Sequence, residues 1–286
     1  MDDEYYNIKV LDKEKTLKIL LDTHASIIRF GDGEMDLIRG ENIPYQNYHP
    51  ELADQMKELL LRGSNRRMLV GLSDVFEGLD RYTDFCQNFY RTVYFPKNKK
   101  ILKEIEAQYN LYVSTFFSRP YIDWVDKSKS KEYFELLKKL WQDRDLLIVE
   151  GKYSRSGENN DLFTGAKSIE RIICPSKNAW DRKTVIEDEI IKYADSKLIL
   201  LMLGPTAKVV VGDLVAQIPN QMLDIGHIDS EYEWMKMGAT TKVKIQHKHT
   251  AEFNFDDSQI KLEDDQDFDQ QIISTIEYIK KGEKIK

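Results

Sequence analysis

Cysteine is scarce in this chain of 286 residues: only Cys86 and Cys174 occur, far apart and outside any C-x-x-C spacing. This scarcity argues against a disulfide framework and a cysteine-based zinc site, and it fits a reducing cytosol. Long hydrophobic runs are also missing, since the longest apolar stretch, "LILLML" from Leu198, is far too short to cross a bilayer. The acidic N-terminal stretch "MDDEYYNIKVLDKEK" lacks the apolar core of a signal peptide. We therefore expect a cytoplasmic protein; peripheral association at the inner face of the membrane stays open.

Positive charge is in deficit, with a formal net charge of -7 and no block of lysines and arginines interleaved with aromatic residues. Such a field disfavours nucleic acid, so we expect no DNA or RNA partner. The G-x-G-x-x-G and G-x-x-x-x-G-K-[ST] patterns are absent as well. Their absence argues against a Rossmann reductase or methyltransferase and against a P-loop enzyme.

Apolar residues are plentiful, at 41% of the chain with 11% aromatic, which is enough for one large domain with a real core. Short β-like runs alternate with segments of helical periodicity, several of the runs being apolar throughout. This alternation predicts an α/β fold, a Rossmann-like, doubly wound and mostly parallel sheet covered by helices on both faces. The predicted strands are 26–30, 67–72, 145–151, 169–175, 197–203 and 221–226.

Two regions depart from this alternation. Residues 76–142 are rich in aromatic residues and helical runs with weak strand signal, which predicts a helical insertion over the sheet or an acceptor-side lobe. The tail, about 254–286, begins acidic and ends with a short helical run closing on "IKKGEKIK"; a charge run of this kind is typical of a solvated surface. We expect a single domain over 1–286.

The stretch "RFGDGEMDLIRG" places Asp32 and Glu34 between a predicted strand and a helix. One interpretation is structural: Asp-Gly forms the turn, and Glu34 complements the helix dipole. The other is a D-x-E metal site, because residues i and i+2 of an extended segment point the same way and carboxylates suit a hard cation.

Three further segments carry candidate ligands after predicted strands, where open parallel sheets bind their ligands. The turn "GPTAKVVV" opens a helix at Gly204 and could hold a diphosphate on backbone N–H groups. The loop "GKYSRSGENNDLF" combines cations, amides and a carboxylate that suit a sugar phosphate. In "ICPSKNAWDR", Asn178 and Trp180 form either a nucleotide shelf or a helix cap and core.

A fourth cluster, "DIGHIDSEYEW", gathers His227, Asp229 and Glu231 after the last predicted strand. A histidine and carboxylates at a strand end are candidates for general-base work or for orienting a sugar hydroxyl. A single histidine is more often structural, so the cluster matters more than His227 alone.

Taken in order, "RFGDGEMDLIRG", "EGKYSRSGENNDLF", "IICPSKNAW", "LILLMLGPTA" and "DIGHIDSEYEW" resemble the glycosyltransferases of the GT-D fold, a bacterial family first catalogued as a domain of unknown function. The five matches run from about residue 26 to 253. The resemblance implies that Asp32 and Glu34 form a D-x-E motif that works with a divalent cation, Mn²⁺ or else Mg²⁺, to bind a nucleotide sugar such as UDP-glucose. The stretch "HKHTAEF" matches more loosely and would supply Lys248 and Glu252 near the diphosphate.

With this resemblance, the predicted function is metal-dependent transfer of a hexose such as glucose from a UDP-sugar. The implied acceptors are oligosaccharide, glycoprotein or lipid-linked glycans in bacterial surface glycoprotein or exopolysaccharide synthesis. The alternative is an inactive nucleotide-sugar-binding accessory subunit of a partner glycosyltransferase; a homo-oligomer also stays open. The candidate catalytic residues are Asp32, Glu34, Asp161, His227, Asp229 and Glu231. The candidate nucleotide-sugar contacts are Arg29, Gly33, Lys152, Arg155, Asn160, Asn178, Trp180, Gly204, Thr206 and Lys248.

Overall fold

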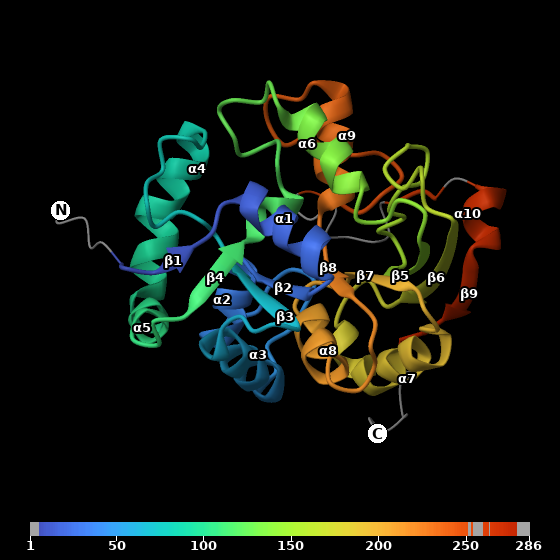
Figure 1. The fold of residues 1–286 in the computed structure, drawn as a ribbon, viewed down its shortest axis with the longest axis horizontal. Coiled ribbons are helices and arrows are strands. Elements are labelled where there is room, and N and C mark those ends of the chain that lie inside the picture. Colours follow the sequence, from blue (N-terminus) through green and yellow to red (C-terminus); the bar gives the residue numbers. More distant parts are fainter. Residues whose placement is uncertain (1–5, 251–252, 254–259, 263, 279–286) are drawn as a thin grey trace.

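The centre of the fold is one parallel sheet, seen in a computed structural model that describes residues 6–250, 253, 260–262 and 264–278. Within these residues the sheet has nine strands in the order β1-β4-β3-β2-β8-β7-β5-β6-β9 (Figure 1). The strands are β1 (Lys9–Val10), β2 (Ser26–Phe30), β3 (Met68–Leu72), β4 (Leu111–Ser114), β5 (Asp145–Gly151), β6 (Ser168–Cys174), β7 (Leu198–Met202), β8 (Met222–Asp224) and β9 (Ile272–Thr275). This arrangement confirms the predicted α/β class and its parallel, Rossmann-like sheet.

Helices cover both faces of the sheet (Figure 1). One face carries α1 (Lys13–Thr23), α6 (Ser130–Lys138) and α9 (Ile228–Met237), and the other carries α2 (Asp32–Ile38), α3 (Pro50–Arg62), α5 (Phe95–Glu106), α7 (Lys183–Tyr193) and α8 (Thr206–Leu214). The remaining elements are α4 (Asp84–Phe89), the π-helix η1 (Tyr90–Tyr94), the 3₁₀ turns η2 (Thr115–Ser118) and η3 (Ala179–Arg182), and α10 (Gln266–Gln270). Within the described residues, no helix is both long and apolar enough to span a bilayer.

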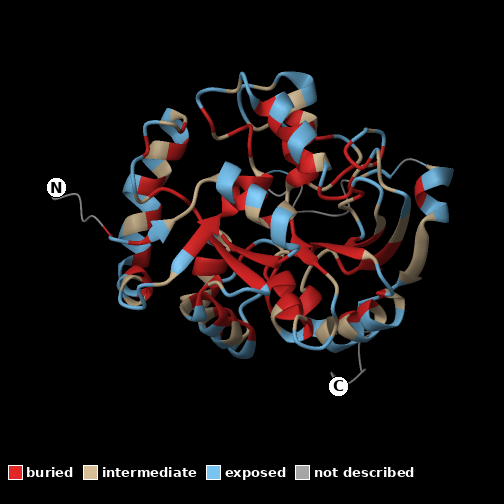
Figure 2. Ribbon diagram, viewed as in Figure 1, coloured by how far each residue is buried: buried red, intermediate tan, exposed pale blue. Residues whose placement is uncertain are grey.

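The apolar strands bury both of their faces, as Figure 2 shows in red. Leu198 and Leu200 of β7 pack into the core under α1, α6 and α9, while Ile199 and Leu201 pack into the core on the opposite face. This follows from the twofold alternation of side chains along a strand. A continuous apolar run such as "LILLM" is therefore the sequence of a strand covered on both sides.

Two regional predictions need correction. Residues 76–142 do contain α4, η1, α5 and α6, but they also contribute β4, which pairs with both β1 and β3 inside the sheet. This region is therefore not purely a helical insertion. In the predicted acidic tail, Ile272–Thr275 form β9 beside β6 instead of a helix, and residues 279–286 lie outside the described residues.

Candidate functional site: a cleft at the carboxyl edge of the sheet

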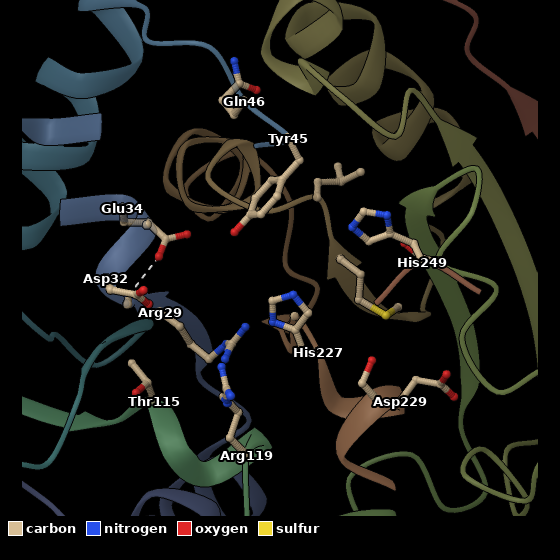
Figure 3. A pocket seen from close by; sticks show the side chains of 18 of the residues that line it. Arg29, Asp32, Glu34, Tyr45, Gln46, Thr115, Arg119, His227, Asp229 and His249 are labelled. Carbon is tan, nitrogen blue, oxygen red and sulfur yellow. Dashed lines mark hydrogen bonds between the residues drawn. The ribbon is translucent and has the colours of Figure 1, made fainter. Parts of the chain in front are cut away.

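A cleft of about 400 Å³ lies across the carboxyl ends of the central strands. Its walls come from segments that follow β2, β3, β4, β5, β6, β7 and β8, so residues far apart in the sequence meet there. Figure 3 shows Asp32, Arg29, Arg119, Tyr45 and His227 gathered around this space. This is the edge at which open parallel sheets bind ligands.

Asp32 stands at the start of α2 with its carboxylate open to the cleft. Gly31 ends β2 in an extended conformation (φ -99°, ψ -165°), and the helix begins at the next residue. The residue is exposed to the cleft, yet protein surrounds its carboxylate on most sides. This limited hydration raises the pKa of the Asp32 carboxyl, Arg119 opposes the rise, and Glu34 adds to it. The described residues provide no ion-pair partner for Asp32.

Glu34 lines the same cleft but is already engaged. One carboxylate oxygen accepts the Gly31 N–H (2.9 Å), as in a capping box, and the other lies 2.8 Å from the Lys208 ammonium. Only 7% of Glu34 is exposed. The two carboxylates of the D-x-E motif, both labelled in Figure 3, therefore differ: Asp32 faces the open cleft, and Glu34 forms a buried ion pair with Lys208.

Lys208 and Arg29 form a charged network on the floor of the cleft. The Lys208 ammonium also lies 3.0 Å from Asp224 and donates to the Gly204 carbonyl (3.0 Å). Asp224 accepts the Arg29 backbone N–H (3.1 Å), and its own carbonyl accepts the Arg29 Nε–H (2.8 Å). A Cβ at Gly226 would lie 1.8 Å from Arg29 Nη2, so glycine is required where the guanidinium passes.

Tyr45 covers the turn at Gly204. Gly204 has φ +52°, and a Cβ there would lie 2.9 Å from the Tyr45 ring. Asn178 fixes this arrangement from behind, because its N–H donates to the Tyr45 carbonyl (2.9 Å) and its side-chain oxygen accepts the Asn47 N–H (2.8 Å). Trp180 is buried against His49. Asn178 and Trp180 thus support the loop that carries Tyr45 and do not themselves line the cleft.

The structure brings together only part of the predicted site. The predicted residues that line the cleft are Arg29, Asp32, Gly33, Glu34, Gly204, His227 and Asp229. The predicted residues placed elsewhere are Lys152, Arg155, Asn160, Asp161, Asn178, Trp180, Thr206, Glu231 and Lys248. Glu252 lies outside the described residues.

The 152–161 loop turns its charged side chains away from the cleft. Arg155 is buried in an ion pair with Glu158 and stacks on the Phe268 ring at 4.2 Å. Asp161 lies at the surface between Lys236 (3.0 Å) and Lys138 (3.2 Å), whose ammonium groups, Lys236 first, hold its pKa below the usual range. Lys152 is exposed. These placements argue against the predicted roles of Arg155 and Lys152 in phosphate binding and of Asp161 as acceptor base.

Asp229 reaches the cleft but also anchors this loop. Its carboxylate accepts the Gly157 N–H (2.8 Å) and the Asn160 side-chain N–H (2.8 Å), and it pairs with Lys248 (3.1 Å). The Lys248 ammonium also donates to the Glu158 carbonyl (2.6 Å). Lys248 and Asn160 therefore hold the loop in place, and the predicted contact of Lys248 with a diphosphate is not supported.

Glu231 is fully buried below the cleft. It accepts the backbone N–H groups of Tyr121 and Ile122 (both 3.0 Å) and lies 3.5 Å from Arg119. Burial raises its pKa to about 7, although Arg119 opposes the rise. Glu231 thus orients Arg119 and the chain after η2, and it is too deep to take a proton from an acceptor. Thr206 is likewise buried, at the start of α8.

Sequence reasoning missed several cleft residues, notably Tyr45, Arg119, Asp123, Lys208 and Lys242. Lys208 did leave a signal, because it is the one charged residue in the apolar stretch "TAKVVVG" that opens α8. A lysine inside such a helix is almost never buried unless it is paired. Arg119 left no comparable signal, since it follows a strand that was itself missed.

A cation site in this cleft would depend mainly on Asp32. Among the described residues there is no cluster of three histidine, cysteine or acidic side chains suited to a metal. Mg²⁺ and Mn²⁺ accept one or two carboxylates, with phosphate and water completing the shell. The donor set therefore fits an ion that arrives with a diphosphate, held by Asp32, with Glu34 adjacent but paired to Lys208.

Comparisons with known proteins agree with this fold. The family model for the glycosyltransferase GT-D fold matches residues 27–253. A structure described as a new glycosyltransferase (DUF1792) from Streptococcus sanguinis superposes with a TM-score of 0.90 at 52% identity, covering 95% of this chain and 100% of that one. Another, of a domain of unknown function 1792 with a distinct glycosyltransferase fold, gives 0.86 at 50% identity over 94% of this chain and 96% of that one. The chain belongs to the glycosyltransferase GT-D fold family, as its motifs predicted.

Two curated relatives are longer proteins. The chain is 54% identical over 273 residues to a probable glycosyl transferase Gly of Streptococcus gordonii, covering 96% of this chain and 39% of that protein. It is 48% identical over 269 residues to the glycosyltransferase GlyD of Streptococcus pneumoniae, covering 94% of this chain and 33% of that protein. The chain thus spans well under half the length of these relatives.

Proposed function

We propose that the cleft binds a UDP-sugar with a divalent cation, Mn²⁺ or Mg²⁺, and transfers its hexose, glucose in the first instance, to a glycan acceptor. Family membership supports glycosyl transfer. The observation that carries the donor and cation assignment is the position of Asp32, a carboxylate with no ion-pair partner among the described residues, which faces a cleft lined by arginine and lysine side chains.

The charge of the cleft supports a cation as part of the ligand. Among the described residues, its lining holds aspartate and glutamate side chains in the same number as arginine and lysine side chains: Asp32, Glu34, Asp123 and Asp229 against Arg29, Arg119, Lys208 and Lys242. Lys208 is already shared by Glu34 and Asp224. A nucleoside diphosphate brings several negative charges into this balanced site, and a divalent cation beside Asp32 would offset them.

In transfer, the acceptor hydroxyl oxygen attacks the anomeric carbon, the bond from that carbon to the diphosphate oxygen breaks, and the nucleoside diphosphate leaves with the bonding electrons. A bound divalent cation would act as a Lewis acid for this leaving group. Arg29 and Lys208 are fixed by Asp224, so their charges are preorganised toward the phosphates. The Tyr45 ring packs against the Gly204 turn, and both residues line the cleft.

The acceptor proton needs a base if the reaction inverts the anomeric centre. Of the four predicted bases, His227 and Asp229 line the cleft, whereas Asp161 and Glu231 do not. Asp229 is engaged by Gly157, Asn160 and Lys248. Asp229 would act from within this network, and His227 is the other candidate in the cleft lining.

We further propose the acceptor to be an oligosaccharide, glycoprotein or lipid-linked glycan of bacterial surface glycoprotein or exopolysaccharide synthesis, handled in the cytoplasm with partner glycosyltransferases. The competing function is an inactive accessory subunit. The charged loop residues Lys152, Arg155 and Asp161 do not line the cleft, so they do not favour activity over this alternative. The case for activity now depends on Asp32 and the residues around it.

Release of UDP from UDP-glucose, with and without acceptor, tests the proposal directly. We expect release in Mn²⁺ or Mg²⁺ that stops in excess EDTA, with UDP preferred over GDP, dTDP and CMP in calorimetry. No metal-dependent release from any UDP-sugar, with UDP still bound, would instead establish the accessory function.

A further inference from the structure

Helix α4 and the π-helix η1 present a mostly aromatic face to the cleft. Phe85, Cys86, Phe89 and Tyr90 all line it, at the spacing that places side chains on one side of a helix. Cys86 and Tyr90 are buried, Phe89 is half-buried, and Phe85 is 73% exposed. The face therefore runs from the wall of the cleft to its mouth, where an aromatic ring stands in water.

The position of this face is fixed by the neighbouring loop. The Thr83 N–H donates to the Asp123 carbonyl (2.9 Å), and the Val125 N–H donates to the Arg81 carbonyl (3.0 Å). Tyr82 and Trp124 are joined by an isolated β-bridge, and their tilted rings pack with centroids 5.0 Å apart. Because α4 begins directly after Thr83, Phe85 and Asp123 belong to one rigid platform.

A polar pair stands on the same platform. Arg119 and Asp123 form an ion pair (3.0 Å), and both line the cleft. Glu231 holds Arg119 from below at 3.5 Å. Arg119 and Asp32 also line the same cleft, as Figure 3 shows. The aromatic face and the proposed reaction centre are thus two parts of one cleft.

The sheet order places this platform on one side of Asp32 and the Gly204 turn on the other. Phe85 and Arg119 follow β3 and β4, Asp32 follows β2, and Gly204 follows β7. In the sheet these strands run β4-β3-β2-β8-β7. With the diphosphate near Gly204 and Lys208, the platform is left for the second substrate.

We propose that Phe85 and Phe89 form the acceptor subsite, stacking on the apolar C–H face of a pyranose ring while Arg119 and Asp123 hydrogen-bond its hydroxyls. This inference rests on the proposed function. A pyranose offers one face of C–H groups and a rim of hydroxyls, which matches an aromatic ring beside a carboxylate and a guanidinium. The ligand class is a carbohydrate, and the ring bound is the one that receives the new linkage.

Saturation-transfer difference NMR with the methyl β-glycosides of glucose, galactose and N-acetylglucosamine, recorded in the presence of UDP and Mn²⁺, tests this subsite. We expect at least one glycoside to bind the wild-type protein with its ring C–H protons saturated most strongly. Phe85→Ala should weaken that glycoside at least tenfold, and Phe85→Trp should retain it. Tyr109→Ala is the matched control, because Tyr109 is 90% exposed and lies outside the cleft lining.

Calorimetry with UDP and Mn²⁺ on the same variants shows whether Phe85 acts at the acceptor subsite or at the donor site. The affinity of Phe85→Ala for UDP should stay within twofold of wild type. If Phe85→Ala lowered the affinity for UDP as much as the affinity for the glycoside, Phe85 would belong to the donor site and the proposal would be overturned. A change of oligomeric state in Phe85→Ala would overturn it as well. No glycoside binding to the wild-type protein, or full binding to Phe85→Ala, would overturn it while leaving the proposed donor function intact. Failure of UDP itself to bind would instead refute the proposed function.

Discussion

The Lys208 ammonium lies 2.8 Å from the Glu34 carboxylate, in a pair whose side chains are 3% and 10% exposed. Each residue has a second partner: Lys208 lies 3.0 Å from Asp224, and Glu34 accepts the Gly31 N–H. The glutamate of the D-x-E motif therefore stabilises the junction between β2 and α2 as well as the cleft. A substitution of Glu34 therefore changes both the stability of the fold and the cleft itself, so stability and activity must be measured separately.

Removing either partner of the Lys208–Glu34 pair should destabilise the fold, and removing Lys208 should cost more than removing Glu34. Lys208→Met leaves Glu34 without its cation and Asp224 with Arg29 alone, so we expect a loss of about 3–5 kcal/mol in the free energy of unfolding. Glu34→Gln should cost less, because Lys208 keeps Asp224. In the double variant the losses should fall short of additivity by at least about 1 kcal/mol. Chemical denaturation of the three variants gives these values; strict additivity would show that the pair does not form.

Asp32 should behave differently, because no described side chain is paired with it. Asp32→Asn should lower turnover about a hundredfold, which corresponds to about 2.7 kcal/mol of transition-state stabilisation, while the free energy of unfolding changes by less than about 1 kcal/mol. Metal-dependent UDP release and thermal melting on the same samples measure both.

The matched control for Asp32 is Asp36→Asn, one helical turn further along α2 and outside the cleft lining. It should keep wild-type turnover. Near-normal activity of Asp32→Asn, or wild-type activity in excess EDTA, would show that Asp32 holds no essential cation.

The sequence predicted the six central strands, with small shifts at their ends, because each contains a run of buried apolar residues. It missed the strands with little local signal: β1 has two residues, β4 begins with an exposed leucine, and β9 is an edge strand of half-buried residues. Their pairing depends on neighbours distant in sequence, which periodicity does not reveal.

The sequence predicted the kinds of residue in the site better than it predicted which residues line the cleft. The turns at Asp32 and Gly204 were found because each follows a predicted strand whose five residues are all buried. In the loop after β5, Arg155, Gly157 and Asn159 have positive φ values of 41°, 79° and 56°, and these turns direct the side chains away from the cleft. Residue types alone do not reveal such backbone turns. The sequence therefore predicted phosphate contacts for Lys152 and Arg155, which do not line the cleft.

Arg155→Ala should therefore affect stability and not donor binding. The substitution leaves Glu158, which is 3% exposed, without its cation and removes the stacking on Phe268. We expect a loss of about 3 kcal/mol or more in the free energy of unfolding, with UDP affinity within twofold of wild type below the melting transition. Arg155→Lys, which keeps the charge but not the planar stack, should lose less. Weaker UDP binding without a loss of stability would restore the role predicted from the sequence.

Glu231 should impose a pH dependence on stability. Burial raises the pKa of Glu231 from 4.5 to about 7, whereas the unfolded chain keeps an ordinary value. Between about pH 4.5 and 7 the native state consequently binds more protons than the unfolded state, so stability from this group is present at low pH and is lost as pH rises. Arg119 limits this loss because its cation faces the carboxylate, and Asp123 increases it.

The Glu231→Gln variant isolates this effect from other carboxyl groups. Its side-chain oxygen can still accept the Tyr121 and Ile122 N–H groups, but it has no charge to lose or gain. The difference in melting temperature between the variant and wild type should therefore shift in favour of the variant from pH 5 to pH 8. Asp74, whose pKa burial raises to about 6, contributes equally to both proteins and cancels in the difference. A difference that stays constant across this range would mean that Glu231 is charged throughout, held in that state by Arg119.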